Sequence, residues 1–255
     1  FTAGVWTIVG TDSPNFNTGP LAATTVYRVW VNADESGCED IYSEVIEVTV
    51  HPDISIAGIS SSGSICTGGT WNLSVTASGS PNILYQWQDS VALGTWQNVS
   101  EPGGTTSAFT TDPLSATTHY RVFVFALEEG CQDLFSSVVS VSVSPDISIT
   151  GLSSGGSICT GGTWNLNVVA TGAPNRLYQW QDSTAAGTWQ NVSEPGGTTP
   201  SFTTDPLTVT TYYRVFVYAT QNGCEDLFSA VVPVVVTPDI SITGLSNGGS
   251  ICTGG

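Results

Sequence analysis

Short stretches in which apolar and polar residues alternate run through the whole chain. The alternation is clearest at 71–77 (WNLSVTA), and shorter runs lie at 83–88, 96–99 and 136–143. The longest strand is predicted at 117–126 (TTHYRVFVFA), with Tyr, Val and Val on one face and Arg, Phe and Phe on the other. A period of two residues is the side-chain repeat of a β-strand that buries one face. Turn signals rich in Gly, Pro, Asn and Asp separate the runs, and none has a helical period. The pattern therefore predicts an all-β protein.

Two segments carry less certain patterns. Residues 58–69 follow a short first strand and are rich in Ser and Gly, so we expect a long loop that carries Cys66. The strand at 136–143 has a counterpart 93 residues later that contains Pro233. Proline has no N–H to donate to a sheet ladder, so we expect this strand at a sheet edge.

The whole pattern repeats with a period of 93 residues. Residues 52–144 and 145–237 align without a gap and agree at 69 of 93 positions. A fixed period of domain size indicates an array of like modules. We therefore predict complete repeats at 52–144 and 145–237, the C-terminal part of a repeat at 1–51, and the N-terminal part of a further repeat at 238–255. On this interpretation the chain is a window onto a longer array.

The number and spacing of strands in each repeat indicate a fold. About seven short strands, with turn signals roughly every 8–12 residues, are typical of a two-sheet β-sandwich. Trp87 and Trp180 in the third strand, with Tyr120 and Tyr213 in the sixth, favour an immunoglobulin-like version. A parallel β-helix is the alternative, but its repeat is far shorter. We expect tandem immunoglobulin-like domains in an extended array, because the proline-containing linkers are very short.

Composition narrows the function. The chain has 21 acidic residues against four Lys and Arg, a net charge of −17, which argues against nucleic-acid binding. No run of about 18 apolar residues is present, so we predict no membrane insertion in this segment. His51 and His119 are not repeated, and no hydrolase, metalloprotease or phosphate-loop motif occurs. We therefore predict no catalytic residue, no metal and no cofactor.

The six cysteines form two sets with the same period: Cys38, Cys131 and Cys224, and Cys66, Cys159 and Cys252. Such evenly placed cysteines indicate disulfides and an extracellular location.

Two pairing schemes are open. One joins Cys66 to Cys131 and Cys159 to Cys224 within each repeat, and it requires the 58–69 segment to fold back along the sandwich. The other joins neighbours, which gives Cys38–Cys66, Cys131–Cys159 and Cys224–Cys252, and it requires strands of two repeats to double back. We favour the first.

Several short motifs recur in both complete repeats. They read Ile65-Cys66-Thr67-Gly68, Tyr85-Gln86-Trp87, Thr118-His119-Tyr120-Arg121-Val122 and Gly130-Cys131 in the first repeat, with matching segments 93 residues later. This pattern resembles the Ig-like repeat domains of very large surface proteins of Bacteroidetes, including gliding-motility adhesins. The resemblance covers the whole chain. It implies a secreted, cell-surface array used for adhesion or as a stalk.

The repeated Asp-Ser pairs are candidate modification sites. Asp89-Ser90-Val91 and Asp182-Ser183-Thr184 occupy matching positions in a predicted exposed loop. They resemble the O-glycosylation signal of Bacteroidetes, which would modify Ser90 and Ser183. The alternative is an ordinary turn in which the Asp side chain caps the local backbone.

A stripe of aromatic residues is predicted on the outward face of the longest strand. It consists of Phe123 and Phe125 in the first repeat and of Phe216 and Tyr218 in the second. Such a stripe would stack on sugars or bind a partner array. The alternative is that loops or the neighbouring Arg121 cover it.

Two functions are therefore expected from the sequence. The first is a structural stalk or filament segment of a large surface adhesin, which holds an adhesive region away from the cell. The second is a multivalent array in which each module binds carbohydrate or a partner weakly. Expected partners are other repeats of the same chain, surface polysaccharide and other surface proteins.

Overall fold

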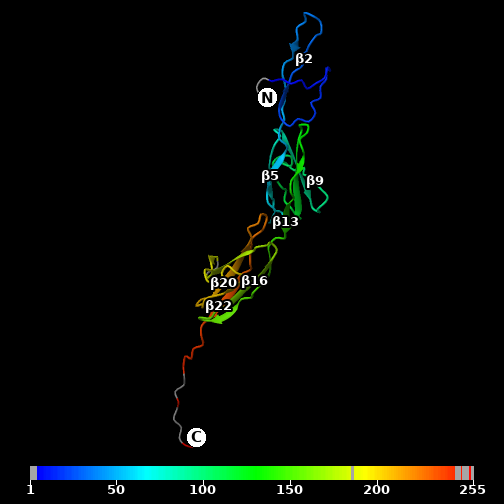
Figure 1. Cartoon of the computed structure of the whole chain (residues 1–255). Helices are drawn as coiled ribbons and strands as arrows, with labels where there is room; N and C mark the ends of the chain where they lie inside the picture. The colour runs from blue at the N-terminus through cyan, green and yellow to red at the C-terminus, as the bar shows by residue number, and fades with distance from the viewer. Residues whose placement is uncertain (1–4, 185–186, 245–247, 249–252, 254–255) are drawn as a thin grey trace. The chain divides into compact units, whose positions relative to one another are not determined.

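The computed structural model describes residues 5–184, 187–244, 248 and 253. Within these residues the chain forms β-strands, turns and extended segments and no helix (Figure 1). Each complete repeat folds into two sheets that pack face to face. The predicted all-β, immunoglobulin-like fold is confirmed.

The first repeat contains a three-stranded sheet of order β10-β7-β5 and a six-stranded sheet of order β6-β13-β11-β8-β9, in which β12 also pairs with β11. Its strands are β5 (Ser55–Ile59), β6 (Gly63–Cys66), β7 (Asn72–Ser78), β8 (Ile83–Ser90), β9 (Gln97–Asn98), β10 (Ala108–Thr110), β11 (Thr118–Ala126), β12 (Leu134–Phe135) and β13 (Val139–Ser144).

The second repeat has the same topology, with sheet orders β14-β16-β19 and β15-β22-β20-β17-β18 and with β21 paired to β20. Its strands are β14 (Ser148–Leu152), β15 (Gly156–Cys159), β16 (Asn165–Thr171), β17 (Leu177–Ser183), β18 (Gln190–Asn191), β19 (Ser201–Thr203), β20 (Thr211–Tyr218), β21 (Leu227–Phe228) and β22 (Val232–Thr237).

Residues before the first repeat form two small antiparallel pairs, β1 with β4 and β2 with β3. Their strands are β1 (Thr25–Tyr27), β2 (Trp30–Val31), β3 (Ile41–Tyr42) and β4 (Ile46–Val48).

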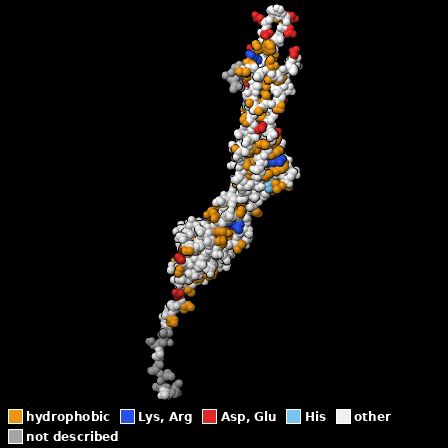
Figure 2. All heavy atoms as spheres, in the orientation of Figure 1, with side chains coloured by type: hydrophobic (Ala, Val, Ile, Leu, Met, Phe, Trp, Pro, Cys, Tyr) orange, Lys and Arg blue, Asp and Glu red, His pale blue; other side chains and the backbone are white. Residues whose placement is uncertain are grey.

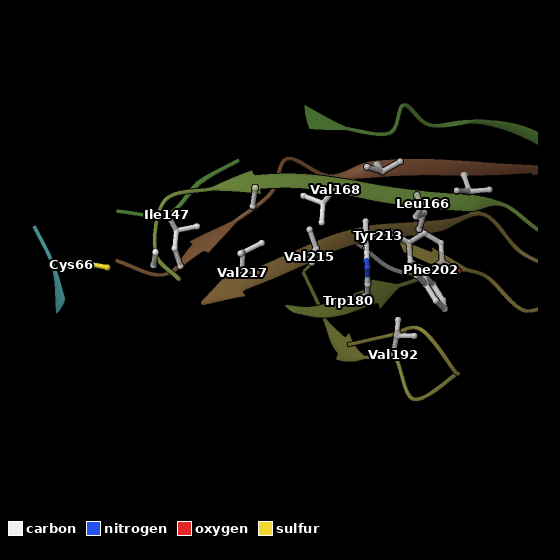
Figure 3. Close-up of a cluster of buried hydrophobic side chains, with 14 residues drawn as sticks. Cys66, Ile147, Leu166, Val168, Trp180, Val192, Phe202, Tyr213, Val215 and Val217 are labelled. Carbon is white, nitrogen blue, oxygen red and sulfur yellow. The ribbon is translucent and has the colours of Figure 1, made fainter. Parts of the chain in front are cut away.

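The core of each repeat follows from the alternation in the sequence. In β20 every second side chain is buried, and Tyr213, Val215 and Val217 point inward. Trp180 on the adjacent β17 is fully buried, and its indole Nε1–H donates to the carbonyl of Thr199 at 2.9 Å. This bond satisfies the single polar group of the largest core side chain. Figure 3 shows these side chains together in the second repeat.

Two sequence expectations are wrong in detail. The segment 58–69 is not one loop, because β6 lies within it and pairs in parallel with β13. The strand containing Pro233 is not an edge strand, because β22 lies between β15 and β20. The proline is tolerated because β15 pairs with β22 only from Val234 onward. No hydrogen bond of the β15–β22 ladder therefore requires a backbone N–H at residue 233.

The chain divides into two compact units. The first comprises Phe1–Ser61, Asn72–Thr110 and His119–Val139. The second comprises Ser62–Trp71, Thr111–Thr118 and Ser140–Gly255. The second unit therefore contains the complete second repeat together with three segments of the first repeat, 62–71, 111–118 and 140–144.

Candidate functional site

A disulfide in the second compact unit joins the two repeats. Cys66, at the end of β6, is bonded to Cys224, which lies 158 residues later in the turn between β20 and β21. The two Cα atoms are 4.8 Å apart, within the usual range for a disulfide. The backbone N–H of Cys66 also donates to the carbonyl of Asn222 at 2.9 Å. One covalent bond and one hydrogen bond thus hold the same two segments.

The two segments approach so closely that only glycine fits at the contact. A Cβ on Gly69 would lie 2.6 Å from the carbonyl oxygen of Asn222, and a Cβ on Gly223 would lie 2.5 Å from the Cα of Gly69. Cys66 is fully buried and belongs to the same hydrophobic cluster as Ile147 and Val217. Figure 3 shows Cys66 at the end of that cluster nearest Ile147.

Hydrogen bonds fix the loop that carries Cys66. The N–H of Gly68 donates to the carbonyl of Leu114 at 2.8 Å, and the N–H of Leu114 donates to the carbonyl of Gly69 at 2.9 Å. The N–H of Thr67 donates to the carbonyl of Ser144 at 3.0 Å. The cysteine is therefore presented by a backbone that its own repeat already holds in place.

The favoured pairings Cys66–Cys131 and Cys159–Cys224 are not formed, and the prediction is wrong. In the second repeat Cys159 pairs with Thr237 at the end of β22, whereas Cys224 precedes the start of that strand at Val232. A strand of six residues spans about 20 Å, which is far beyond disulfide reach. These cysteines are separated because β15, in a segment expected to be a loop, pairs in parallel with β22.

The alternative pairing of neighbours is wrong as well. Cys38, Cys131 and Cys159 are free thiols, and Cys224 is already bonded to Cys66. Cys252 lies outside the described residues. The disulfide is typical of secreted proteins.

The outward face of β11 carries an arginine stacked between rings. The guanidinium carbon of Arg121 lies 4.3 Å from the ring centroid of Trp96 and 4.2 Å from that of Phe135. Phe123 lies 4.8 Å from Phe135 and stacks on Phe125 at 5.1 Å. We call this row of five side chains the aromatic ladder.

The second repeat reproduces the aromatic ladder. Arg214 lies 4.3 Å from the Trp189 ring and 4.2 Å from the Phe228 ring, and Phe216 stacks on Tyr218 at 5.1 Å. The residues before the first repeat contain a matching cation–π pair, with Arg28 over Trp6 and Tyr42.

The predicted stripe therefore faces outward but is not an open patch. Phe123, Phe125, Phe216 and Tyr218 are each only partly exposed, and the most exposed rings of the ladder are Phe135 and Phe228, at 50% and 51%. Trp96 and Phe135 were not among the residues predicted for this stripe. Their recurrence as Trp189 and Phe228 was the signal available in the sequence.

The candidate O-glycosylation serines are buried. Ser90 and Ser183 end strands β8 and β17 and are 2% and 4% exposed. The hydroxyl of Ser90 donates to the carbonyl of Ala92. The expectation that both lie in an exposed loop is wrong, since the strands run two residues further than predicted. Their modification stays a prediction, and it would have to precede folding.

Burial also affects the acids beside these serines. Desolvation raises the pKa of Asp89 and of Asp182, and the nearby Glu101 and Glu194 add to the effect in the first and second repeat respectively. No group of three or more His, Cys, Asp or Glu side chains in the described residues is arranged to hold a metal ion. The described part of the chain likewise contains no helix that would span a lipid bilayer.

Figure 2 shows one face of the molecule, on which hydrophobic side chains are scattered among uncharged polar groups and Lys or Arg side chains are few. A shallow, open pocket is lined by residues 54–59 and 134–137.

Solved structures similar to the chain contain immunoglobulin domains. A marsupial T cell receptor is 14% identical over 74% of this chain and 75% of its own, with a TM-score of 0.54. Three N-terminal domains of the outer capsid protein Hoc of bacteriophage RB49 are 14% identical over 86% of this chain and 80% of their own, with a TM-score of 0.49. The I67–I69 fragment of titin is 10% identical over 85% and 75%, with a TM-score of 0.43. At such identities the likeness concerns the fold alone.

No curated protein sequence matches the chain. The sequence pattern of one family, described as a domain of unknown function (DUF8696), matches twice, at residues 56–145 and 149–238. The two matches cover most of the chain and follow the 93-residue period. The chain therefore belongs to the DUF8696 family, of which it carries two tandem immunoglobulin-like copies.

Proposed function

We propose that the chain is a stalk segment of a large, repetitive, extracellular surface adhesin, which holds an adhesive region away from the cell. The observation that supports this most directly is the Cys66–Cys224 bond between consecutive repeats. A segment that transmits tension gains from a covalent path that does not depend on the packing of any one core. Ligand binding by a single module has no need of such a bond.

The surface chemistry agrees with a stalk. The net charge of −17 makes the modules repel one another and resist collapse in solution. In the aromatic ladder the arginine fills the space between the rings that a sugar would otherwise occupy. Expected partners are other repeats of the same polypeptide.

Immunogold labelling of intact cells of the source organism tests the proposal. An antibody raised against the chain should decorate surface filaments along their length. Labelling confined to filament tips would contradict a stalk and would favour a role in direct attachment.

A multivalent binding array is the second candidate, and one observation favours it. Phe135 and Phe228 are half-exposed rings at the same place in successive repeats. An array of weak sites of this kind would bind surface polysaccharide or another surface protein through multivalency.

A glycan array probed with the full chain separates the two functions. The binding array predicts a saturable signal that Phe228→Ala weakens, whereas the stalk predicts none. Val231→Ala is the matched control, since Val231 is equally exposed but lies outside the aromatic ladder.

A further inference from the structure

The same ten residues, GSICTGGTWN, occur at 63–72 and at 156–165 but are buried differently. Ile65 and Cys66 are fully buried, whereas Ile158 is partly buried and Cys159 is exposed. Identical sequences in identical strands differ in burial only through what covers them. We call 63–69 and 156–162 the donor loops, and the segment that covers the first of them, 222–224, an acceptor turn.

The acceptor turn shows the same contrast between repeats. A Cβ on Gly223 would collide with the donor loop at Gly69, as described above. The equivalent Gly130 has the same left-handed backbone, with φ of +87° against +80°, but no atom of the described residues lies within 4 Å of its Cβ position. The turn 129–131 of the first repeat is therefore an acceptor turn of the same shape that no described segment covers, and its Cys131 is a free thiol.

The donor loop of the second repeat is already folded for docking. The N–H of Gly161 donates to the carbonyl of Leu207 at 2.7 Å, and the N–H of Leu207 donates to the carbonyl of Gly162 at 2.9 Å. These bonds match those that Gly68 and Gly69 make with Leu114. Docking therefore requires no rearrangement of the loop, which reduces the entropy that it costs.

The contacts at the junction tolerate the sequence differences between repeats. Asn222 accepts the hydrogen bond of Cys66 through its backbone carbonyl, and Gly223 makes its contact through the backbone. Glu129 and Gly130 supply the same backbone groups. An acceptor turn thus needs only the glycine and the cysteine, and both are present in each repeat.

We infer that Cys159 is an attachment site for a further copy of this repeat, placed directly after the second repeat in the same polypeptide. Cys159 bonds to the cysteine of that copy which corresponds to Cys224, and Cys131 receives the donor-loop cysteine of a copy that precedes the first repeat. Each repeat is then joined covalently to the next in an overlapping ladder. The inference rests on the proposed function in that it requires further repeats on either side of the two complete ones.

The bond forms by thiol–disulfide exchange with an oxidised dithiol oxidoreductase or a small disulfide such as oxidised glutathione. The first thiolate attacks the oxidant and forms a mixed disulfide, with release of one thiol. The second thiolate then displaces the other thiol and closes the new S–S bond. Two cysteine thiols are oxidised, the oxidant takes up the electron pair, and two protons are transferred to its thiols.

A three-repeat chain tests the inference. Residues 238–255 repeat 145–162, so appending a copy of 163–237 to the C-terminus completes a third repeat. Cys38→Ser and Cys252→Ser are included, which leaves Cys66, Cys131, Cys159, Cys224 and the appended copy of Cys224. After oxidation with a glutathione buffer, we expect two disulfides and one alkylatable thiol, at Cys131. Non-reducing peptide mapping should link Cys159 to the appended cysteine.

The possible results decide the matter. If Cys66–Cys224 forms but Cys159 stays a thiol or pairs with Cys131, the ladder is wrong, while the stalk function, tested by labelling, is unaffected. If neither bond forms, the junction itself is wrong and the inference fails with it. Tip-only immunogold labelling together with a Cys159 bond would instead reject the stalk and keep the ladder.

Gly162→Ala in the same chain tests whether the bond depends on docking. At the occupied junction a Cβ on Gly69 would meet Asn222 at 2.6 Å, so we expect the Cys159 bond to form at least tenfold more slowly. Gly151→Ala is the matched control, because its Cβ meets only the Val169 side chain at 3.4 Å. If the Cys159 bond forms at the same rate in both variants, its formation does not depend on docking of the donor loop, and the inference is overturned.

Discussion

At the scale of single residues, a glycine in each repeat leaves the space in which a tryptophan ring packs against a strand. An ideal Cβ on Gly156 would lie 2.3 Å from Cη2 of Trp164, and one on Gly63 would lie 2.1 Å from Cη2 of Trp71. Gly63 belongs to β6, which ends at Cys66 of the junction, and Gly156 belongs to the matching strand β15 of the second repeat. Glycine is therefore required at these two positions because any side chain would overlap the tryptophan ring, and not because the backbone must be flexible there.

Gly156→Ala should destabilise the second repeat by about 1–3 kcal/mol, because the added methyl group overpacks the site and displaces the ring. Urea unfolding followed by tryptophan fluorescence measures the change. Gly151→Ala should alter stability by no more than about 0.5 kcal/mol, since it meets only an ordinary contact. Equal effects of the two substitutions would contradict the packing argument.

A second residue-scale prediction concerns pH. Burial raises the pKa of Asp182, with a further contribution from Glu194, so the folded state holds its proton more tightly than the unfolded state. The stability that this provides is present below the ordinary pKa of 3.8 and is lost as the pH rises through the folded pKa. Asp182→Asn should therefore reduce the loss of stability between the acid range and neutral pH. Denaturation midpoints measured across that range test the difference.

Glu128 provides a comparison of opposite sign. Hydrogen bonds from Ser80 and Asn82 lower its pKa, so its contribution is present above the ordinary value of 4.5 and is lost as the pH falls. Glu128→Gln should make the chain less sensitive to acid. If the two substitutions change the pH dependence of stability in the same direction, relative to the unsubstituted chain, one of the two assignments is wrong.

At the scale of elements, the aromatic ladder joins each central strand to its flanking segments. Arg214 on β20 stacks on Trp189 before β18 and on Phe228 in β21, and its Nε–H donates to Gln181 of β17 at 2.8 Å. Arg214→Lys keeps the charge but loses the planar stack and the Nε donor. We expect a loss of about 1–2 kcal/mol in the free energy of unfolding. Arg121→Lys should cost the same in the first repeat, and a negligible change in both would show that the stacking is incidental.

Sequence patterns predicted the elements that bury one face. The longest strand was expected at 117–126 and is β11, Thr118–Ala126, because its inward Tyr and Val side chains alternate strictly. The alternation does not extend to β6, where four residues pair in parallel with a strand more than 70 residues away. A local sequence pattern carries no signal for pairing with a distant strand. The Ser- and Gly-rich composition around β6 therefore predicts a loop where the structure has a strand.

The junction was less predictable than the fold for a related reason. The spacing of the cysteines showed two periodic sets, but the choice of partner depends on which end of the sandwich each set occupies. The parallel strand β15 places Cys159 at the end of β22, away from Cys224. The aromatic ladder was half predicted, since Phe123 and Phe125 lie on a regular strand. Trp96 lies directly before β9 and Phe135 lies in β12, and both strands have only two residues, too few to show an alternation.

At the scale of the whole molecule, the junction changes how the chain responds to force. The Cys66–Cys224 bond encloses most of both repeats in a covalent loop with a sequence separation of 158 residues. When the chain is pulled from its ends, tension passes through the sulfur atoms and not through the strands inside the loop. Strands β5, β6, β21 and β22 lie outside the loop and bear the tension, whereas the strands within the loop carry none as long as the bond is intact.

Single-molecule force spectroscopy tests this consequence. Reduction of the bond should add about 550 Å to the contour length at full extension, since an extended chain spans about 3.5 Å per residue. The unfolding of the strands within the loop should appear in the force curve only after reduction. Cys224→Ser should give the long contour length and the core unfolding events without any reductant. A contour length that is the same in the oxidised chain, the reduced chain and the Cys224→Ser variant would show that the repeats bear load individually, as unlinked modules do.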